Sequence, residues 1–128
     1  MKQYNPSEIE KKWQKIWEEE RRFEVNNHEP GKENRYVLIE FPYPSGKGLH
    51  TGHVRSYSAM DAVARKLRMQ GYNVLFPMGC DAFGLEAERT AIREKKLPQE
   101  IVARNIATFK KQLTSLGLSV DWSREVTE

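Results

Sequence analysis

YVLIEFPYPSGKGLHTGH, residues 36–53, is the stretch of the chain that decides its fold. The first part, Tyr36–Phe41, is a short apolar run of strand-forming residues, which predicts a buried strand of a parallel sheet. Pro42 and Pro44 end that strand, and Ser45–Gly48 has the composition of a glycine-rich turn. The stretch therefore predicts a strand that passes through a turn into the next element.

The residues after this stretch complete a βαβ unit. A helix is predicted from Gly52 to a C-cap at Gly71, with one apolar face formed by Tyr57, Met60, Ala64 and Leu67. A second strand is predicted at Asn73–Phe76, ended by Pro77. Strands joined by such a crossover helix are parallel. The sequence therefore predicts an α/β fold with a parallel sheet flanked by helices.

Further helices are predicted on both sides of this unit. The first begins near Pro6, and its two tryptophans, Trp13 and Trp17, are expected to dock on the core. Another occupies part of 81–96, and a third begins at Pro98. The expected apolar face of the third is Val102, Ile106, Phe109, Leu113 and Leu116. Only two strands are clear, whereas a doubly wound sheet has about five or six, so we expect a piece of a larger domain.

Composition excludes several classes of protein. The 128 residues suit about one domain, and the chain contains neither a long apolar run nor a secretory h-region at its start. The single cysteine, Cys80, excludes an internal disulfide and favours a reducing compartment, which indicates the cytoplasm. The net charge of +3 is compatible with a nucleic-acid partner, although ordinary solvated faces explain it better.

Chemistry is expected where the first strand meets its helix. His50, Gly52 and His53 stand at the predicted helix N-terminus, which offers free N–H groups and partial positive charge to a phosphate. The glycine spacing fits neither a dinucleotide fingerprint nor a Walker A loop. Two other interpretations stay open from the residues alone. The histidines could be half of a zinc site completed by Cys80 and Asp81, or they could simply cap the helix.

The H-x-G-H pattern in this context resembles the class I aminoacyl-tRNA synthetases, and among them the leucyl-tRNA synthetase family. The likeness covers nearly the whole chain. The blocks that carry it are Phe41–Gly46, Gly48–Arg55, Arg68–Leu75, Pro77–Gly79, Asp81–Leu85, Ser115–Gly117 and Asp121–Glu125. It implies a Rossmann-like catalytic domain that joins leucine to ATP as leucyl-adenylate, with Mg²⁺, and then transfers leucine to tRNA(Leu).

The resemblance also implies roles for individual residues. His50 and His53 match the catalytic histidines that bind ATP phosphates, and Pro42 and Gly52 complete the expected ATP site. Phe41, Tyr43 and Asp81 match the leucine site, with Asp81 holding the ammonium group. A carboxylate is also the partner that physics favours for a cation brought into an apolar pocket. From the residues alone, Asp81 could equally be a helix N-cap.

Departures from the family pattern concern Glu40, Cys80 and Glu86, where the family usually has an apolar residue, a tryptophan and a proline. These departures bear on the shape and affinity of the leucine pocket more than on membership of the family. The family's lysine-rich K-M-S-K-S loop, its editing domain and its anticodon-side domain are not in residues 1–128. We therefore expect the N-terminal part of the catalytic domain, weakly active or inactive alone and prone to self-association. The alternative is a truncated ATP- or RNA-binding module without catalysis.

Overall fold

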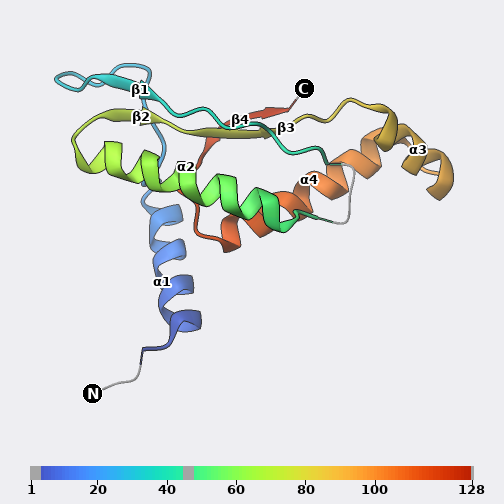
Figure 1. Cartoon of the computed structure of the whole chain (residues 1–128), viewed down its shortest axis with the longest axis horizontal. Helices are drawn as coiled ribbons and strands as arrows, with labels where there is room; N and C mark the ends of the chain where they lie inside the picture. The colour runs from blue at the N-terminus through green and yellow to red at the C-terminus, as the bar shows by residue number, and fades with distance from the viewer. Residues whose placement is uncertain (1–3, 45–47, 128) are drawn as a thin grey trace.

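The structure is a computed structural model that describes residues 4–44 and 48–127, so the predicted turn at Ser45–Lys47 lies outside the described residues. Helices and strands follow in this order: α1 (Pro6–Glu19), β1 (Asn34–Tyr36), α2 (Thr51–Met69), β2 (Asn73–Leu75), β3 (Pro77–Cys80), α3 (Leu85–Glu94), α4 (Pro98–Ser115) and β4 (Asp121–Thr127). In Figure 1, α2 and α4 lie on the same side of the strands, and α3 lies at one end. The α/β architecture predicted from the sequence is confirmed.

The predicted βαβ unit is present. β1 and β2 pair in parallel, with Arg35 opposite Val74, and α2 connects them. The expected inner face of α2 is also correct, since Tyr57 and Ala64 are buried, and Met60 and Leu67 pack against the same core. The core therefore lies between the strands and the two long helices.

The first strand differs from its prediction in position and burial. β1 ends at Tyr36, and only the amide of Val37, which donates to the Leu75 carbonyl at 2.9 Å, continues the pairing. Burial then alternates along the chain: Val37 and Ile39 are buried, whereas Leu38 between them is exposed. Helices cover this run on one side only, which buries every second side chain, so the predicted buried strand is buried on one face.

Pro77 does not end the second strand as predicted. It begins β3, which follows β2 after Phe76 alone, and β3 pairs in parallel with β4. The strand thus changes neighbour at Pro77, from β1 to β4, and the Phe76 carbonyl accepts a hydrogen bond from the Asp121 amide at 2.9 Å. Proline is tolerated in an extended segment where its missing N–H is not needed, which is the case at a change of partner.

The buried face of α4 is rotated relative to the prediction. The buried residues are Ile101, Asn105, Phe109 and Leu113. Leu116 is exposed, and the expected Val102 and Ile106 are only partly covered. The polar Asn105 lies in the buried stripe because its side chain has a hydrogen-bond partner there, which periodicity of apolar residues does not reveal.

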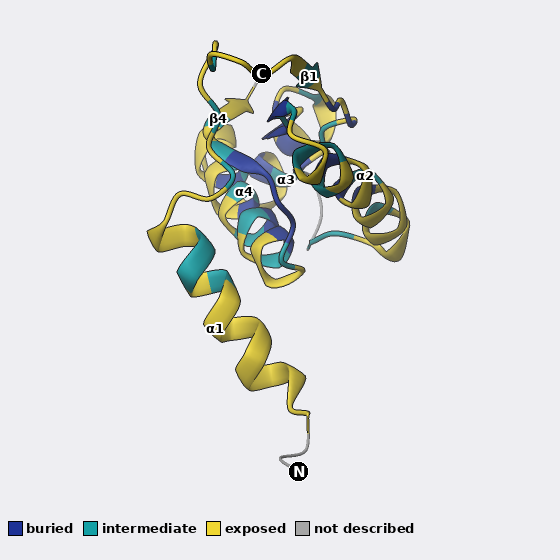
Figure 2. Ribbon diagram, turned by 90° about the vertical axis from the view of Figure 1, so that its left-hand side faces the viewer, coloured by how far each residue is buried: buried dark blue, intermediate teal, exposed yellow. Residues whose placement is uncertain are grey.

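The first helix does not dock as predicted. α1 projects from the rest of the chain in Figures 1 and 2, and it contains no buried residue. Trp13 is 46% exposed, whereas Trp17 is half-buried against Phe23, with ring centroids 5.6 Å apart. Only the C-terminal end of α1 therefore contacts the core. Within the described residues, no helix is both long enough and apolar enough to span a membrane.

Candidate functional site

Two histidines meet at the N-terminus of α2. His50 is the N-cap residue, with extended backbone, and His53 lies in the first turn. Their rings stack with centroids 3.7 Å apart and planes inclined by 24°. The two side chains form a capping box at this helix end, so the capping interpretation of the pair is confirmed, and neither ring is buried by it. The arrangement places two imidazoles where an anion would be bound.

One hydrogen bond fixes which nitrogen of His53 carries the proton. The His50 amide donates to Nδ1 of His53 at 3.2 Å. A nitrogen that accepts cannot carry the proton of a neutral ring, so the proton lies on Nε2. Desolvation, and then the positive charge of His50, lower the pKa of His53, while the Glu40 carboxylate opposes them. His53 is therefore poised as a neutral donor through Nε2.

Tyr57 links the histidines to the end of the strand segment. Its side chain is fully buried, its ring lies 5.5 Å from that of His53, and its hydroxyl donates to the Glu40 carbonyl at 3.2 Å. Burial raises the pKa of the phenol well above its ordinary value, so the hydroxyl keeps its proton and remains a donor. α2 is thus tied directly to the backbone one residue before Phe41.

The residues predicted for leucine come together at the neighbouring chain segments. The Asp81 amide donates to the Pro42 carbonyl at 3.2 Å, and the Tyr43 hydroxyl donates to the Phe83 carbonyl at 3.0 Å. Phe41 packs against the core, and the Asp81 side chain is exposed. The structure therefore brings Phe41, Pro42, Tyr43 and Asp81 to one end of the strands.

Asp81 is not a helix cap. α3 begins at Leu85 with Gly84 as its N-cap, three residues further along the chain. A side chain on Gly84 would collide with the Tyr43 hydroxyl, so a larger residue here would displace Tyr43 from the Phe83 carbonyl. The capping interpretation of Asp81 is thus wrong, and its carboxylate is available for another role.

The zinc interpretation has no ligand set in residues 4–44 and 48–127. No group of three or more His, Cys, Asp or Glu side chains there is placed to hold a metal ion. Cys80 is buried, and desolvation raises the pKa of its thiol to about 11, which keeps it protonated rather than a thiolate ligand. The cysteine is best explained as a small apolar core residue.

Two polar residues near the histidines were missed by the sequence analysis. Asn105 and Gln112 of α4 bond the backbone on either side of residues 45–47. Their only sequence signal is that they are seven residues apart, and therefore lie on one helix face. Apolar periodicity gives no weight to amides, so it does not single these residues out.

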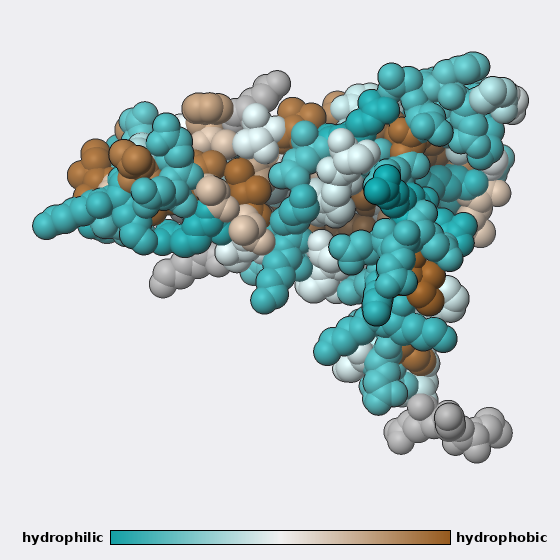
Figure 3. Space-filling model, turned by 180° about the vertical axis from the view of Figure 1, so that it is seen from behind, coloured by the Kyte–Doolittle hydropathy of each residue, from teal (hydrophilic) through white to brown (hydrophobic). Residues whose placement is uncertain are grey.

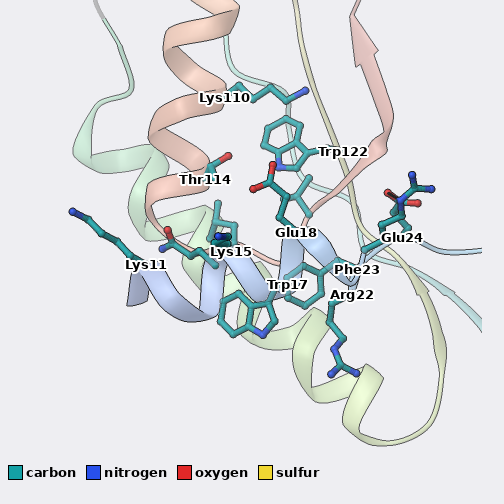
Figure 4. A pocket seen from close by; sticks show the side chains of 15 residues that line it. Lys11, Lys15, Trp17, Glu18, Arg22, Phe23, Glu24, Lys110, Thr114 and Trp122 are labelled. Atoms are coloured by element: carbon teal, nitrogen blue, oxygen red, sulfur yellow. Dashed lines mark ion pairs between the residues drawn. The ribbon is translucent and has the colours of Figure 1, made fainter. Parts of the chain in front are cut away.

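A hollow of about 550 Å³ lies elsewhere, between α1 and α4. Trp17, Phe23 and Trp122 form its apolar wall, and Lys110 lies 4.8 Å from the Trp122 ring (Figure 4). None of the predicted site residues lines it. It is therefore a separate feature, formed because α1 contacts the core only at one end.

Comparisons with known proteins agree with the geometry. Residues 35–128 match the family described as tRNA synthetases class I (M). The chain is 60% identical over 126 residues to a leucine–tRNA ligase of Alkaliphilus oremlandii, covering 98% of this chain and 16% of that protein. It is 56% identical over 122 residues to the leucine–tRNA ligase of Brucella ovis, covering 95% of this chain and 14% of that protein. The chain thus spans about a sixth of these relatives.

Solved structures give the same result. A LeuRS of Agrobacterium radiobacter K84, in a ternary complex with tRNA and LeuAMS, superposes with a TM-score of 0.88 and 41% identity, covering 98% of this chain and 16% of that one. A Mycobacterium tuberculosis methionyl-tRNA synthetase in complex with methionyl-adenylate superposes with a TM-score of 0.66 and 31% identity, covering 70% of this chain and 17% of that one. With the histidine pair at the strand–helix junction and the match over residues 35–128, the chain belongs to the class I tRNA synthetases and is a homologue of leucine–tRNA ligases.

Proposed function

We propose that residues 1–128 are the N-terminal catalytic portion of a leucine–tRNA ligase. The reaction is activation of leucine by ATP to leucyl-adenylate, followed by transfer of leucine to tRNA(Leu). The observation that carries this proposal is the stacked His50–His53 pair at the start of α2, next to the cluster of Phe41, Tyr43 and Asp81. Identity of 60% to a leucine–tRNA ligase supports leucine as the amino acid.

The proposed chemistry is a displacement at phosphorus. A carboxylate oxygen of leucine attacks the α-phosphorus of ATP, and the bond from that phosphorus to the bridging oxygen of pyrophosphate breaks. Charge grows on the phosphate oxygens as this happens, and donors aimed at them lower the barrier. His50 and the Nε2 proton of His53 are the donors we assign, helped by the positive end of α2. No proton transfer by either histidine is required.

ATP is assigned to Pro42, His50, Gly52 and His53. Gly52 lies so close to His50 that an added Cβ would be 2.9 Å from that ring, so a larger residue would displace the histidine. The backbone of the first helical turn can then approach a phosphate closely. Mg²⁺ belongs to this scheme as the counter-ion that ATP brings with it, and no protein ligand is assigned to it.

Leucine is assigned to the other half of the site. Asp81 would pair with the ammonium group, while Phe41 and Tyr43 line the space for the apolar side chain. The pairing is favourable because a charge-assisted hydrogen bond is stronger than a neutral one. Glu40 directly precedes Phe41, and its charge opposes the lowering of the His53 pKa.

The test is leucine-dependent exchange of pyrophosphate into ATP. We would use a chimaera in which this chain replaces the matching 126 residues of the A. oremlandii ligase. Exchange with leucine, and not with methionine, is expected. Binding of ATP or RNA by the 128-residue chain, with no exchange by the chimaera, would instead favour the truncated binding module, and neither binding by the chain nor exchange by the chimaera would overturn both.

Two properties of the chain are part of the proposal. Self-association is proposed through exposed apolar side chains around α3, where Phe83 is 81% and Ile92 79% exposed, and Figure 3 shows hydrophobic atoms at this end. Sedimentation of the chain as a monomer at high concentration would contradict it.

A cytoplasmic location is proposed because a reducing compartment keeps the Cys80 thiol free, and cell fractionation tests it.

A further inference from the structure

Two amide side chains of α4 reach across to the segments that flank the histidine motif. Nδ2 of Asn105 donates to the Pro44 carbonyl at 2.6 Å, and Oε1 of Gln112 accepts from the Leu49 amide at 2.8 Å. Pro44 is the last described residue before 45–47, and Leu49 directly precedes His50. We refer to Asn105 and Gln112 as the amide pair.

The distance between the two members of the amide pair is fixed by the helix that carries them. Seven residues separate its members, so both lie on one face of α4, about 10.5 Å apart along the axis. Asn105 is buried, and Gln112 is half-buried. A rigid helix therefore sets the distance between the two backbone points, one at the end of the strand segment and one at the beginning of α2.

Gly48 shows how closely Gln112 approaches the backbone. Gly48 has a φ of +145°, which L side chains rarely adopt, and an added Cβ would lie 2.5 Å from Nε2 and 2.9 Å from Oε1 of Gln112. The positive φ requires a glycine here, and a side chain would in addition displace the Gln112 amide. The sequence at 48 is thus adapted to the amide at 112, in addition to any need of the ligand.

Packing alone does not explain two amides on the inner face of this helix. The same face carries Ile101, Phe109 and Leu113, and an apolar side chain at 105 would fill the space without a polar group to satisfy. What the amides add is direction, because a hydrogen bond fixes the position of the carbonyl or amide that it joins. The groups fixed here lie on either side of the residues that lead into His50.

We propose that Asn105 and Gln112 are positioning residues that set where His50 and His53 stand relative to the strand segment that ends at Pro44. They do not touch the reacting atoms. Their action is through the Leu49 amide and the Pro44 carbonyl, and hence through the start of α2. The expected effect of the amide pair on the rate of exchange rests on the proposed function. Its effect on the position of the His50 and His53 rings does not.

The test compares Gln112→Met and Asn105→Leu with Gln99→Met, which makes the same change on the exposed first turn of α4. In the chimaera, kcat for pyrophosphate exchange should fall about tenfold to a hundredfold in the first two, because small misplacements of reacting groups are costly. The KM for leucine should stay unchanged, as should all parameters of Gln99→Met. Because Gln112 is only half-buried, Gln112→Met decides the matter if Asn105→Leu does not fold.

A second measurement on the 128-residue chain separates this inference from the proposed function. Gln112→Met should speed hydrogen exchange at the Leu49 amide and shift the NMR signals of the stacked His50 and His53 rings, whereas Gln99→Met should do neither. Unchanged histidine signals, or an unchanged kcat in a folded and otherwise active Gln112→Met chimaera, would overturn the inference. A wild-type chimaera without exchange activity would overturn the proposed function, and the NMR result would then still decide whether the amide pair positions the histidines.

Discussion

The two ends of α2 are built in opposite ways. At the C-terminal half, Asp61 accepts hydrogen bonds from Nε of Arg65 at 2.7 Å and from the amide and hydroxyl of Ser119, both at 2.6 Å. Arg68 donates to the same serine. At the N-terminal end, His50 and His53 form a capping box in which each ring faces the other residue's backbone amide, and both rings remain accessible to solvent.

This contrast separates stability from function along one helix. A buried carboxylate costs free energy unless its oxygens are fully bonded, so the Asp61 network must be complete to be tolerated. A binding site needs the reverse, namely donors that are held in place but not used up by the protein. α2 therefore anchors itself at one end and presents its donors at the other.

The largest effect should come from breaking the anchored end. Asp61 is only 8% exposed, so Asp61→Ala leaves Arg65 and Ser119 without their shared partner. Ser119 is fully buried, and each of its two donors left without an acceptor lowers the free energy of unfolding by about 1–3 kcal/mol, while the partly exposed Arg65 loses its ion pair as well. Chemical denaturation measures this. The matched control is Glu19→Ala, which breaks the exposed i,i+4 pair with Lys15 and should cost about 0–1 kcal/mol. Similar losses in both variants would contradict the contrast.

The open end should show the reverse pattern. His50→Ala or His53→Ala in the chimaera should slow pyrophosphate exchange about 100- to 1000-fold, because a donor aimed at developing charge is removed. The free energy of unfolding should change far less than in Asp61→Ala. An unchanged rate with a raised KM for leucine would remove the histidines from the catalytic step.

A smaller effect is expected at Asp81. Asp81→Asn keeps the size of the side chain but loses the charge that we assign to the leucine ammonium, a bond worth about 1.5–3 kcal/mol. Leucine affinity, measured by calorimetry on the chimaera, should fall about tenfold to a hundredfold, while ATP affinity should barely change. Glu100→Gln, on the first turn of α4, controls for removing a surface charge. Equal leucine affinity in both variants would exclude Asp81 from the site.

These experiments depend on features that the sequence predicts unequally. The βαβ unit and the histidine position were predictable, because the switch from strand to helix pattern and the H-x-G-H spacing are local signals. The change of strand partner at Pro77 was not, since it depends on β4, which begins at Asp121. The inner face of α4 was predictable in part: Phe109 and Leu113 follow from apolar periodicity, whereas Asn105 does not, because a hydrogen bond to the Pro44 carbonyl satisfies its buried amide. Long-range hydrogen bonds leave no periodic trace in the sequence.

The smallest effect concerns the protonation of His53. Its pKa lies below the ordinary 6.5, first because of desolvation and then because of the His50 charge, whereas Glu40 acts in the opposite direction. NMR titration of the 128-residue chain should therefore give a His53 midpoint below 6.5. A midpoint at or above that value would contradict the lowered pKa and its assignment to desolvation and the His50 charge.

Two single variants should move that midpoint in opposite directions. His50→Ala removes a repelling positive charge and should raise the pKa of His53 partway towards 6.5, because desolvation, the larger cause, remains. Glu40→Gln removes a favourable negative charge and should lower it further. Since the unfolded chain binds this proton more readily than the folded one, the contribution of His53 to stability is present above pH 6.5 and is lost as the pH falls through that region. His50→Ala should weaken this loss and Glu40→Gln should strengthen it. Shifts in the same direction for both variants would show that burial, and not the two neighbouring charges, controls the ring.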